Sequence, residues 1–135
     1  YGLEKKPGVE ETLRFLRAKG IKTAVATATA LDITKSHLTT IGVCDLFDSI
    51  VSAKNVAHGK PEPDVYLYAC EQIGERPQDC MAVEDSPNGI MAAYRAGLRT
   101  VMVPDLTQPD EELTKYLYAC VNSLSDLCEL VDKED

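Results

Sequence analysis

The sequence predicts an α/β fold in which helices cover both faces of a parallel sheet, a three-layer α/β/α Rossmann-like arrangement. Three observations predict it. The order helix, glycine, strand occurs four times along the chain. Each predicted strand is a short continuous apolar run, as in parallel strands that are buried on both faces. Polar residues follow the strands, at the sheet edge where ligands of open α/β sheets bind.

The four units follow one another without a linker. Each helix is predicted by apolar residues at helical spacing and ends at a glycine, the residue that best tolerates a left-handed helix cap. Each strand that follows consists mainly of small or β-branched residues. The predicted helix, glycine and strand are 7–19, Gly20 and 21–27; 32–41, Gly42 and 49–52; 63–73, Gly74 and 80–84; and 88–96, Gly97 and 100–103.

The rest of the chain continues the pattern less regularly. A polar turn at 104–109 precedes a predicted helix at 110–118, a short edge strand at 119–121 and a last helix at 124–131, followed by an acidic tail. A doubly wound domain ordinarily begins with a strand, whereas this chain begins with a helix that such a strand would precede. We therefore expect either a piece of a longer protein or an unusual start.

Composition narrows the class of protein. With 44% hydrophobic and 27% charged residues, the 135 residues are typical of one globular domain. A net charge of −8 argues against nucleic acid, whose phosphates require a basic surface. No apolar run approaches the ~20 residues of a membrane span, and the first residues have no signal-peptide core. We expect a cytoplasmic protein that binds neither nucleic acid nor membrane.

The cysteines and tyrosines are first interpreted as structural. The five cysteines are irregularly spaced without a CxxC pair, which indicates free, reduced core residues, with a reactive or bridging cysteine as the alternative. The tyrosines fit amphipathic helix faces, where the ring packs and the hydroxyl reaches water. These tyrosines are Tyr66, Tyr68, Tyr94, Tyr116 and Tyr118. Helical spacing places Tyr66 and Cys70 on the buried side of the helix predicted for 63–73.

Polar residues at four predicted strand ends and in one loop suggest a phosphate site. The apolar run 80–83 ends in Glu84 and Asp85, and carboxylates are the ligands that Mg²⁺ selects. The Thr27 hydroxyl and neighbouring backbone N–H groups, at the end of another strand, could bind phosphate oxygens. Lys60, in a loop stiffened by two prolines, could neutralise a phosphoryl group. Ser52 and residues 104–105 also follow strands.

Each of these residues also has a plainer interpretation. A carboxylate pair at a strand end can be solvated, with Asp85 or Ser86 capping the next helix. Alone, Thr27 is more often an ordinary strand-end hydroxyl, and Lys60 a surface lysine. Only the combination favours phosphoryl transfer, and that combination lacks a nucleophile.

The ordered motifs resemble the core domain of the haloacid dehalogenase-like superfamily, in the branch of β-phosphoglucomutase and phosphoglycolate-phosphatase-like enzymes. An apolar strand ending in Thr27 is similar to the second motif of the family, Gly59-Lys60-Pro61-Glu62-Pro63-Asp64 to the third, and Glu84-Asp85-Ser86-Pro87-Asn88-Gly89-Ile90 to the fourth. The resemblance implies an Mg²⁺-dependent phosphohydrolase or phosphomutase that acts on a small phosphorylated metabolite through an aspartyl-phosphate.

The resemblance also implies roles for single residues. Thr27 and Lys60 would be catalytic: Thr27 and Ala28 would bind the phosphoryl group, and Lys60 would steady it. Asp85, helped by Glu84, would bind Mg²⁺. The residues that would shape the turn after them are Ser86, Asn88 and Gly89.

The chain departs from the family in two respects that bear on activity. The first motif, an Asp-x-Asp-Gly-Thr that supplies the nucleophile, occurs nowhere in residues 1–135, and the helical cap is also absent. In the family the strand carrying that motif is central, so a gap is expected between the strands that end at Thr27 and Glu84. We therefore expect residues 1–135 to be the C-terminal part of a core domain, inactive alone, with exposed sheet edges that allow self-association.

Two non-enzymatic alternatives remain open. A response-regulator receiver also joins a parallel sheet to Mg²⁺, a strand-end hydroxyl and a lysine, but it holds its acidic pair after the first strand. A ligand-binding module that kept the fold and lost the chemistry would explain the missing Asp-x-Asp.

Overall fold

The computed structural model describes residues 9–27, 30–103, 111–121 and 124–134. In chain order its helices and strands are α1 (Val9–Ala18), β1 (Ala24–Thr27), α2 (Leu31–Thr40), η2 (Cys44–Leu46), β2 (Ser49–Ser52), η3 (Ala53–Asn55), α3 (Asp64–Ile73), η4 (Pro77–Asp79), β3 (Met81–Glu84), α4 (Pro87–Ala96), β4 (Arg99–Met102), α5 (Glu111–Thr114), β5 (Ala119–Cys120) and α6 (Leu124–Glu134). The predicted α/β alternation is confirmed.

The predicted glycines do end the first four long helices. Gly20, Gly42, Gly74 and Gly97 all have positive φ, between +71° and +93°. At Gly74 this left-handed turn lets its N–H bond the carbonyls of the last turn of α3, and it redirects the chain toward β3. The repeated glycine therefore has a backbone cause, because other residues rarely adopt this conformation.

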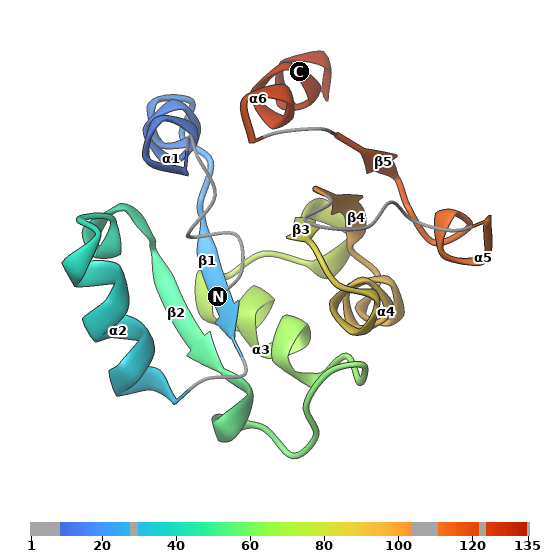
Figure 1. Cartoon of the computed structure of the whole chain (residues 1–135), viewed down its shortest axis with the longest axis horizontal. Helices are drawn as coiled ribbons and strands as arrows, with labels where there is room; N and C mark the ends of the chain where they lie inside the picture. The colour runs from blue at the N-terminus through green and yellow to red at the C-terminus, as the bar shows by residue number, and fades with distance from the viewer. Residues whose placement is uncertain (1–8, 28–29, 104–110, 122–123, 135) are drawn as a thin grey trace.

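The strands form two parallel sheets rather than one. In the described residues β1 pairs with β2, and β3 pairs with β4, which pairs with β5. Figure 1 shows the first sheet separated from the second, with β1 and β3 as the facing edges. The gap expected between the strands that end at Thr27 and Glu84 is confirmed, since no ladder joins β1 to β3 among the described residues.

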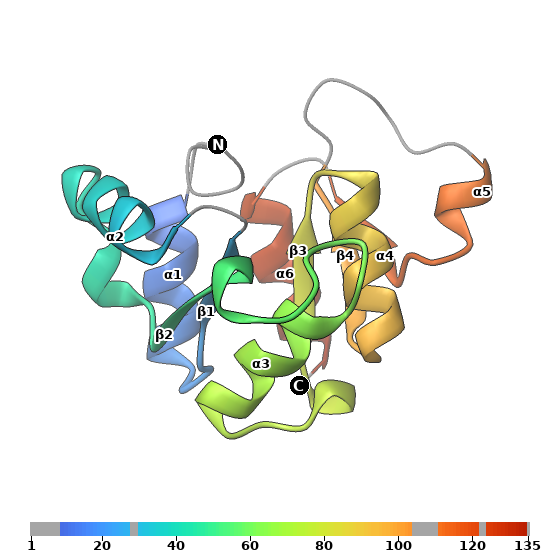
Figure 2. The same ribbon diagram turned by 90° about the horizontal axis from the view of Figure 1, so that it is seen from below.

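Helices cover the strands on both sides. α3 packs against α4 on one side, and α1 packs against α6 on the other (Figure 1 and Figure 2). The larger core lies between α3, α4 and the strands, and a smaller core joins α1 and α2. The buried residues of the larger core are Val51, Val65, Tyr66, Ala69, Cys70, Ala82, Ala92, Ala93, Ala96 and Leu98.

The predicted start of β1 and the predicted end of the helix at 110–118 were wrong. In both cases hydrogen bonds to residues outside the predicted element set the observed boundary. β1 begins at Ala24 instead of residue 21: the N–H of Ile21 bonds back to Leu16, and Thr23 is held by Asp48, before the ladder with β2 begins. The helix predicted for 110–118 ends at Thr114. The chain then turns, and the N–H of Tyr118 donates to the carbonyl of Thr100 in β4, which directs the chain into β5.

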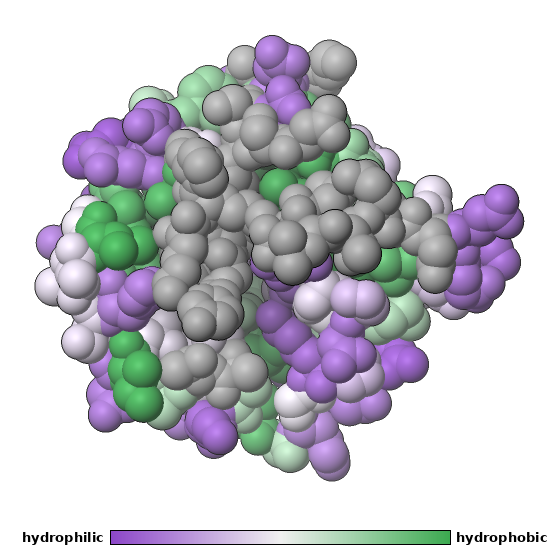
Figure 3. Space-filling model, viewed as in Figure 1, coloured by the Kyte–Doolittle hydropathy of each residue, from purple (hydrophilic) through white to green (hydrophobic). Residues whose placement is uncertain are grey.

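Two further expectations concern the C-terminal helix and the cysteines. α6 runs to Glu134, past the predicted 131, because 132–134 contain no glycine or proline to end it. Cys120 is exposed on β5, so the prediction that all five cysteines are core residues was wrong for it. Figure 3 shows hydrophilic residues over α5 and isolated hydrophobic spots over α2, where Ile33 and Ile41 are exposed.

None of the helices in the described ranges is long and apolar enough to span a membrane.

Candidate active site

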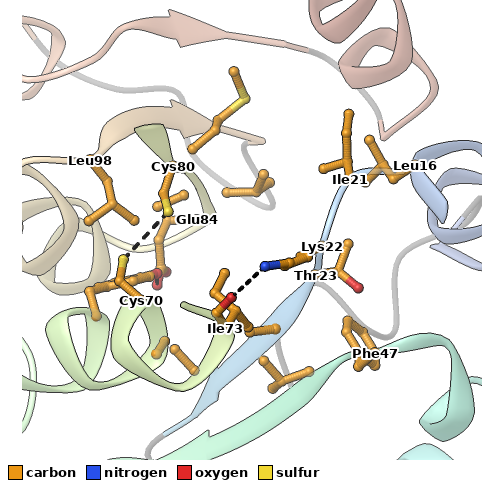
Figure 4. Close-up of a pocket in the computed structure, with 18 of the residues that line it drawn as sticks. Leu16, Ile21, Lys22, Thr23, Phe47, Cys70, Ile73, Cys80, Glu84 and Leu98 are labelled. Atoms are coloured by element: carbon orange, nitrogen blue, oxygen red, sulfur yellow. Dashed lines mark hydrogen bonds between the residues drawn. The ribbon is translucent and has the colours of Figure 1, made fainter. Parts of the chain in front are cut away.

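A cavity of about 890 Å³ lies between the two sheets, where the edges of β1 and β3 face each other. Most of the predicted site residues line it together: Thr27, Lys60, Glu84, Asp85 and Ser86. Figure 4 looks into this cavity, with Glu84 on the β3 side and Thr23 on the β1 side. Folding therefore brings into one space residues that are up to 59 positions apart in the sequence, from Thr27 to Ser86.

Lys60 connects the two sides of this cavity. Its Nζ donates a hydrogen bond of 2.6 Å to Glu84 Oε2 and one of 3.3 Å to the backbone carbonyl of Ala26 in β1. The ammonium is largely buried, with 19% of the side chain exposed. It thus places a positive charge between the carboxyl ends of β1 and β3, which is where a phosphate ester of an α/β protein binds.

The loop that carries Lys60 is held at both ends. The Asp64 carboxylate accepts a hydrogen bond from the backbone N–H of His58 at 3.2 Å. From α4, the Arg95 guanidinium donates to the Pro61 carbonyl and to Glu62, each at 3.3 Å. These contacts join residues on both sides of Lys60 to helices, so the position of its ammonium is set by the fold.

Glu84 is a buried acid with two donors. Its side chain is 8% exposed, and Oε2 accepts hydrogen bonds from Lys60 and from the Tyr66 hydroxyl. The Lys60 Nζ also lies 5.2 Å from the centroid of the Tyr66 ring. Burial, and after it the Glu84 charge, raises the pKa of Tyr66 well above its ordinary value, so the hydroxyl stays protonated and donates.

Tyr66 is a site residue that the sequence interpretation missed. The expectation that its hydroxyl reaches water was wrong, because the side chain faces the end of β3 from α3 and is buried. Helical spacing had placed Tyr66 on the buried side of its helix. A buried phenol requires a hydrogen-bond partner, and that requirement was the available signal.

The turn after Glu84 is shaped by contacts at the start of α4. Ser86 is the N-cap residue, and its Oγ accepts a hydrogen bond from the Gly89 N–H at 3.2 Å. A Cβ on Gly89 would stand 2.0 Å from Glu84 Oε1, so only glycine leaves room for this carboxylate. Asn88 is exposed in the first turn. Asp85 therefore follows a fixed acid and precedes a capped helix.

Thr27 is half-buried at the end of β1, opposite Ser52 in β2 and next to the carbonyl that Lys60 binds. Ala28 lies outside the described residues, as do residues 104–105.

The residues present fit one part of a Mg²⁺ site. Glu84 and the half-buried Asp85 offer carboxylate oxygens, and Mg²⁺ is commonly bound by one or two carboxylates together with waters and substrate phosphate. Within the described ranges no group of three or more His, Cys, Asp or Glu side chains could hold a metal ion. The donor set has the right chemistry for Mg²⁺ and needs further oxygen ligands.

Comparison with known proteins identifies the family. The model of the haloacid dehalogenase-like hydrolase family matches residues 2–97. Hexitol phosphatase B of Escherichia coli K12 is 33% identical over 128 residues, which cover 95% of this chain and 56% of that protein. The phosphorylated carbohydrates phosphatase of Thermotoga maritima is 35% identical over 99 residues, 73% of this chain and 46% of its own.

Solved structures agree with the sequence relatives. CbbY from Rhodobacter sphaeroides in complex with xylulose-(1,5)bisphosphate superimposes with a TM-score of 0.80 and 32% identity, covering 90% of this chain and 55% of that one. The chain spans about half the length of these relatives. The expected β-phosphoglucomutase-like branch is confirmed by a Thermotoga maritima structure of that description, with a TM-score of 0.85 and 29% identity over 94% of this chain and 59% of that one. The chain belongs to the haloacid dehalogenase-like hydrolase family.

Proposed function

We propose that this chain is the core of a cytoplasmic, Mg²⁺-dependent phosphohydrolase or phosphomutase that acts on a small sugar phosphate. The observation that carries the proposal is the Lys60 ammonium held between Ala26 of β1 and Glu84 of β3, next to Asp85. The relatives support the substrate class, since two are named for hexitol or carbohydrate phosphates and a third was solved with a sugar bisphosphate.

Each side chain has a role in binding or charge compensation. The Thr27 hydroxyl and the backbone N–H groups after it, including that of Ala28, would bind phosphoryl oxygens. Lys60 would steady the phosphoryl group against the attacking carboxylate. Asp85 and Glu84 would hold Mg²⁺, which supplies positive charge that offsets the phosphoryl oxygens. Ser86, Asn88 and Gly89 would keep this acidic turn in place.

The attacking carboxylate would come from a strand that fills the cavity. The facing edges of β1 and β3 have no strand partner in the described residues, and Lys60 binds the edge carbonyl of Ala26. A strand between them that ends in Asp-x-Asp-Gly-Thr would place an acid beside Lys60 and Asp85. A second copy of this chain would pair with the same strand edges, and this pairing would produce self-association.

The proposed reaction has two steps, and in each step one bond to phosphorus forms and one breaks. An aspartate oxygen attacks phosphorus in line, the ester P–O bond breaks, and the sugar hydroxyl leaves with a proton, forming an aspartyl-phosphate. Water, or a second sugar hydroxyl in a mutase, attacks the same phosphorus and frees the aspartate. Residues 1–135 alone bind the phosphate and do not turn it over.

Thermal unfolding tests the part of the site that this chain holds. Adding about 10 mM Mg²⁺ with inorganic phosphate should raise the melting temperature by about 5 °C if the dissociation constant is near ~1 mM. Asp85→Asn should lose this shift. Asp79→Asn is the matched control, because Asp79 is an exposed acid at the other end of β3 that pairs with Arg76. No shift in the unsubstituted chain, or an equal shift in Asp85→Asn, would contradict the proposed metal site.

A further inference from the structure

Two cysteines from different elements meet in the same cavity. Cys70 is on α3 and Cys80 directly precedes β3, and their Sγ atoms are 3.6 Å apart. Figure 4 shows the two side chains pointing toward one another. The other cysteines lie elsewhere: Cys44 in η2, Cys120 in β5 and Cys128 in α6. A pair of thiols in contact is a site that neither the proposed phosphate chemistry nor the metal ligands use.

The chain between these cysteines is folded so that it holds them in place. The N–H of Glu75 donates to the Cys70 carbonyl at 3.0 Å, closing the end of α3. The N–H of Cys80 donates to the Pro77 carbonyl at 3.0 Å, at the end of η4. Both cysteines are thus fixed by short-range hydrogen bonds, and little further ordering is needed to join them.

The distance between the thiols is close to what a covalent bond requires. A disulfide bond is about 2.05 Å long, so the sulfurs need to approach by about 1.5 Å from the 3.6 Å seen here. Rotation about the Cα–Cβ bond of one side chain moves a sulfur by more than that.

Among the described residues no strand fills the cavity between β1 and β3, so in residues 1–135 a small reagent can reach the pair through it. Both cysteines line the space of about 890 Å³ between the sheets. Cys80 is half-buried, whereas Cys70 is 3% exposed. Cys80 is therefore the sulfur that a reagent meets first, and Cys70 lies behind it at contact distance.

We propose that Cys70 and Cys80 form a redox-active dithiol that closes to a disulfide by exchange with a low-molecular-weight disulfide such as oxidised glutathione. The Cys80 thiolate attacks one glutathione sulfur, the glutathione S–S bond breaks, and one glutathione thiolate leaves. The Cys70 thiolate then attacks Cys80 Sγ and releases the second. The two protein thiols lose two protons and two electrons, and oxidised glutathione becomes two reduced glutathione molecules.

The new bond would connect α3 to the start of β3 on one side of the cavity. Tyr66, which binds Glu84, lies one helical turn before Cys70 on α3. Oxidation would therefore fix the spacing of the helix and strand that position the proposed phosphate site. The inference itself rests on the thiol geometry alone and does not require the chain to be a phosphatase.

The test is oxidation of the reduced, folded chain by oxidised glutathione, followed by alkylation in denaturant and mass spectrometry. Apart from any glutathione on exposed Cys120, the five thiols should fall to three with a loss of ~2 Da, and a peptide map should join Cys70 to Cys80. The map is made on the unsubstituted chain, so it does not depend on whether a variant folds.

Two cysteine substitutions distinguish a bridge between Cys70 and Cys80 from oxidation elsewhere in the chain. Cys80→Ser should keep its four thiols, apart from any glutathione on exposed Cys120, whereas Cys120→Ser should still lose two of its four. Four outcomes would overturn the proposal: a folded chain that keeps all five thiols, a stable glutathione adduct on Cys80, a bridge between other cysteines, or a bridge between two chains.

Discussion

α3 contacts β3 and the residue before it through two pairs of side chains. One pair is a hydrogen bond to a charged carboxylate, and the other is a pair of thiols. Tyr66 contacts Glu84, the last residue of β3, through a hydrogen bond to a buried charge. Four positions later on the helix, Cys70 contacts Cys80, four positions earlier in the sequence than Glu84. A helix that follows a parallel strand runs back along the sheet, so one helix face meets both ends of one strand. Charge at the carboxyl end and thiols at the amino end therefore share one side of the cavity.

Removing the charged contact should have the largest effect on stability. Glu84→Ala leaves the Lys60 ammonium and the Tyr66 hydroxyl without their acceptor in a buried site. Breaking one partner of a buried pair typically costs about 3 kcal/mol of unfolding free energy. Urea denaturation of the purified variant measures it.

The control is the exposed ion pair between Arg95 of α4 and Glu62, which lies in the loop that carries Lys60. Glu62→Ala removes the partner of Arg95, where both side chains are about half exposed, at 52% and 45%. Exposed pairs contribute about 0.5 kcal/mol. Equal losses in Glu84→Ala and Glu62→Ala would mean that burial of Glu84 has no energetic consequence.

Crowding the same carboxylate should have a smaller effect. In Gly89→Ala the new methyl meets Glu84 Oε1 at 2.0 Å and forces the acid away from Lys60, a loss of about 2 kcal/mol. Gly59→Ala is the matched variant, because its methyl would lie 3.8 Å from Ala53, in ordinary contact. The melting temperatures of the two alanine variants should differ, and a Gly89→Ala chain as stable as Gly59→Ala would contradict the close packing.

Removing only the tyrosine hydroxyl should cost less again. Tyr66→Phe keeps the ring beneath Lys60 and deletes one donor to Glu84, a loss of about 1.5 kcal/mol. Tyr68→Phe, on the same helix and half-buried, is the control and should be within about 0.5 kcal/mol of the unsubstituted chain. If Tyr66→Phe is as stable as Tyr68→Phe, the hydroxyl does not contribute to holding Glu84.

At the thiol pair the expected effect is on rate. Burial first, then the contact with Cys80, raises the pKa of Cys70 to about 12. The pKa of Cys80 is also raised, by burial and by Glu75 and Asp79, against the opposing contact with Cys70 and the Arg99 charge. Thiolates attack, so disulfide closure should accelerate about tenfold per pH unit between about pH 7 and 9. Counting the remaining thiols over time measures this rate. A rate of disulfide closure that does not change with pH would contradict raised pKa values for the two thiols.

Much of the site could be predicted because it depends on local pattern. The glycine that ends each helix, the acids that end an apolar strand and the lysine followed by two prolines are all visible in sequence. Parallel strands bring their ends together, so Thr27, Lys60, Glu84 and Asp85 line one cavity as expected.

The rest depends on how α3 is rotated and placed against β3, which local pattern does not specify. Helical spacing put Tyr66 and Cys70 on the buried side of α3 without showing what they meet there. Glu84 and Cys80 became their partners only through that packing. The helix predicted for 110–118 failed for a similar reason, because the bond from Tyr118 to Thr100 redirects the chain into β5.

Release of phosphate from a substrate tests whether Lys60 and Asp85 form part of a phosphoryl-transfer site. An apolar strand ending in Asp-x-Asp-Gly-Thr is joined to residue 1 by a flexible linker, and hydrolysis of 4-nitrophenyl phosphate is followed with Mg²⁺. We predict turnover by this longer chain and a loss of about 100-fold or more in its Lys60→Ala or Asp85→Asn variant, with no turnover by residues 1–135 alone. Mg²⁺-dependent turnover by residues 1–135 alone, or a longer chain that is active and indifferent to both substitutions, would contradict it.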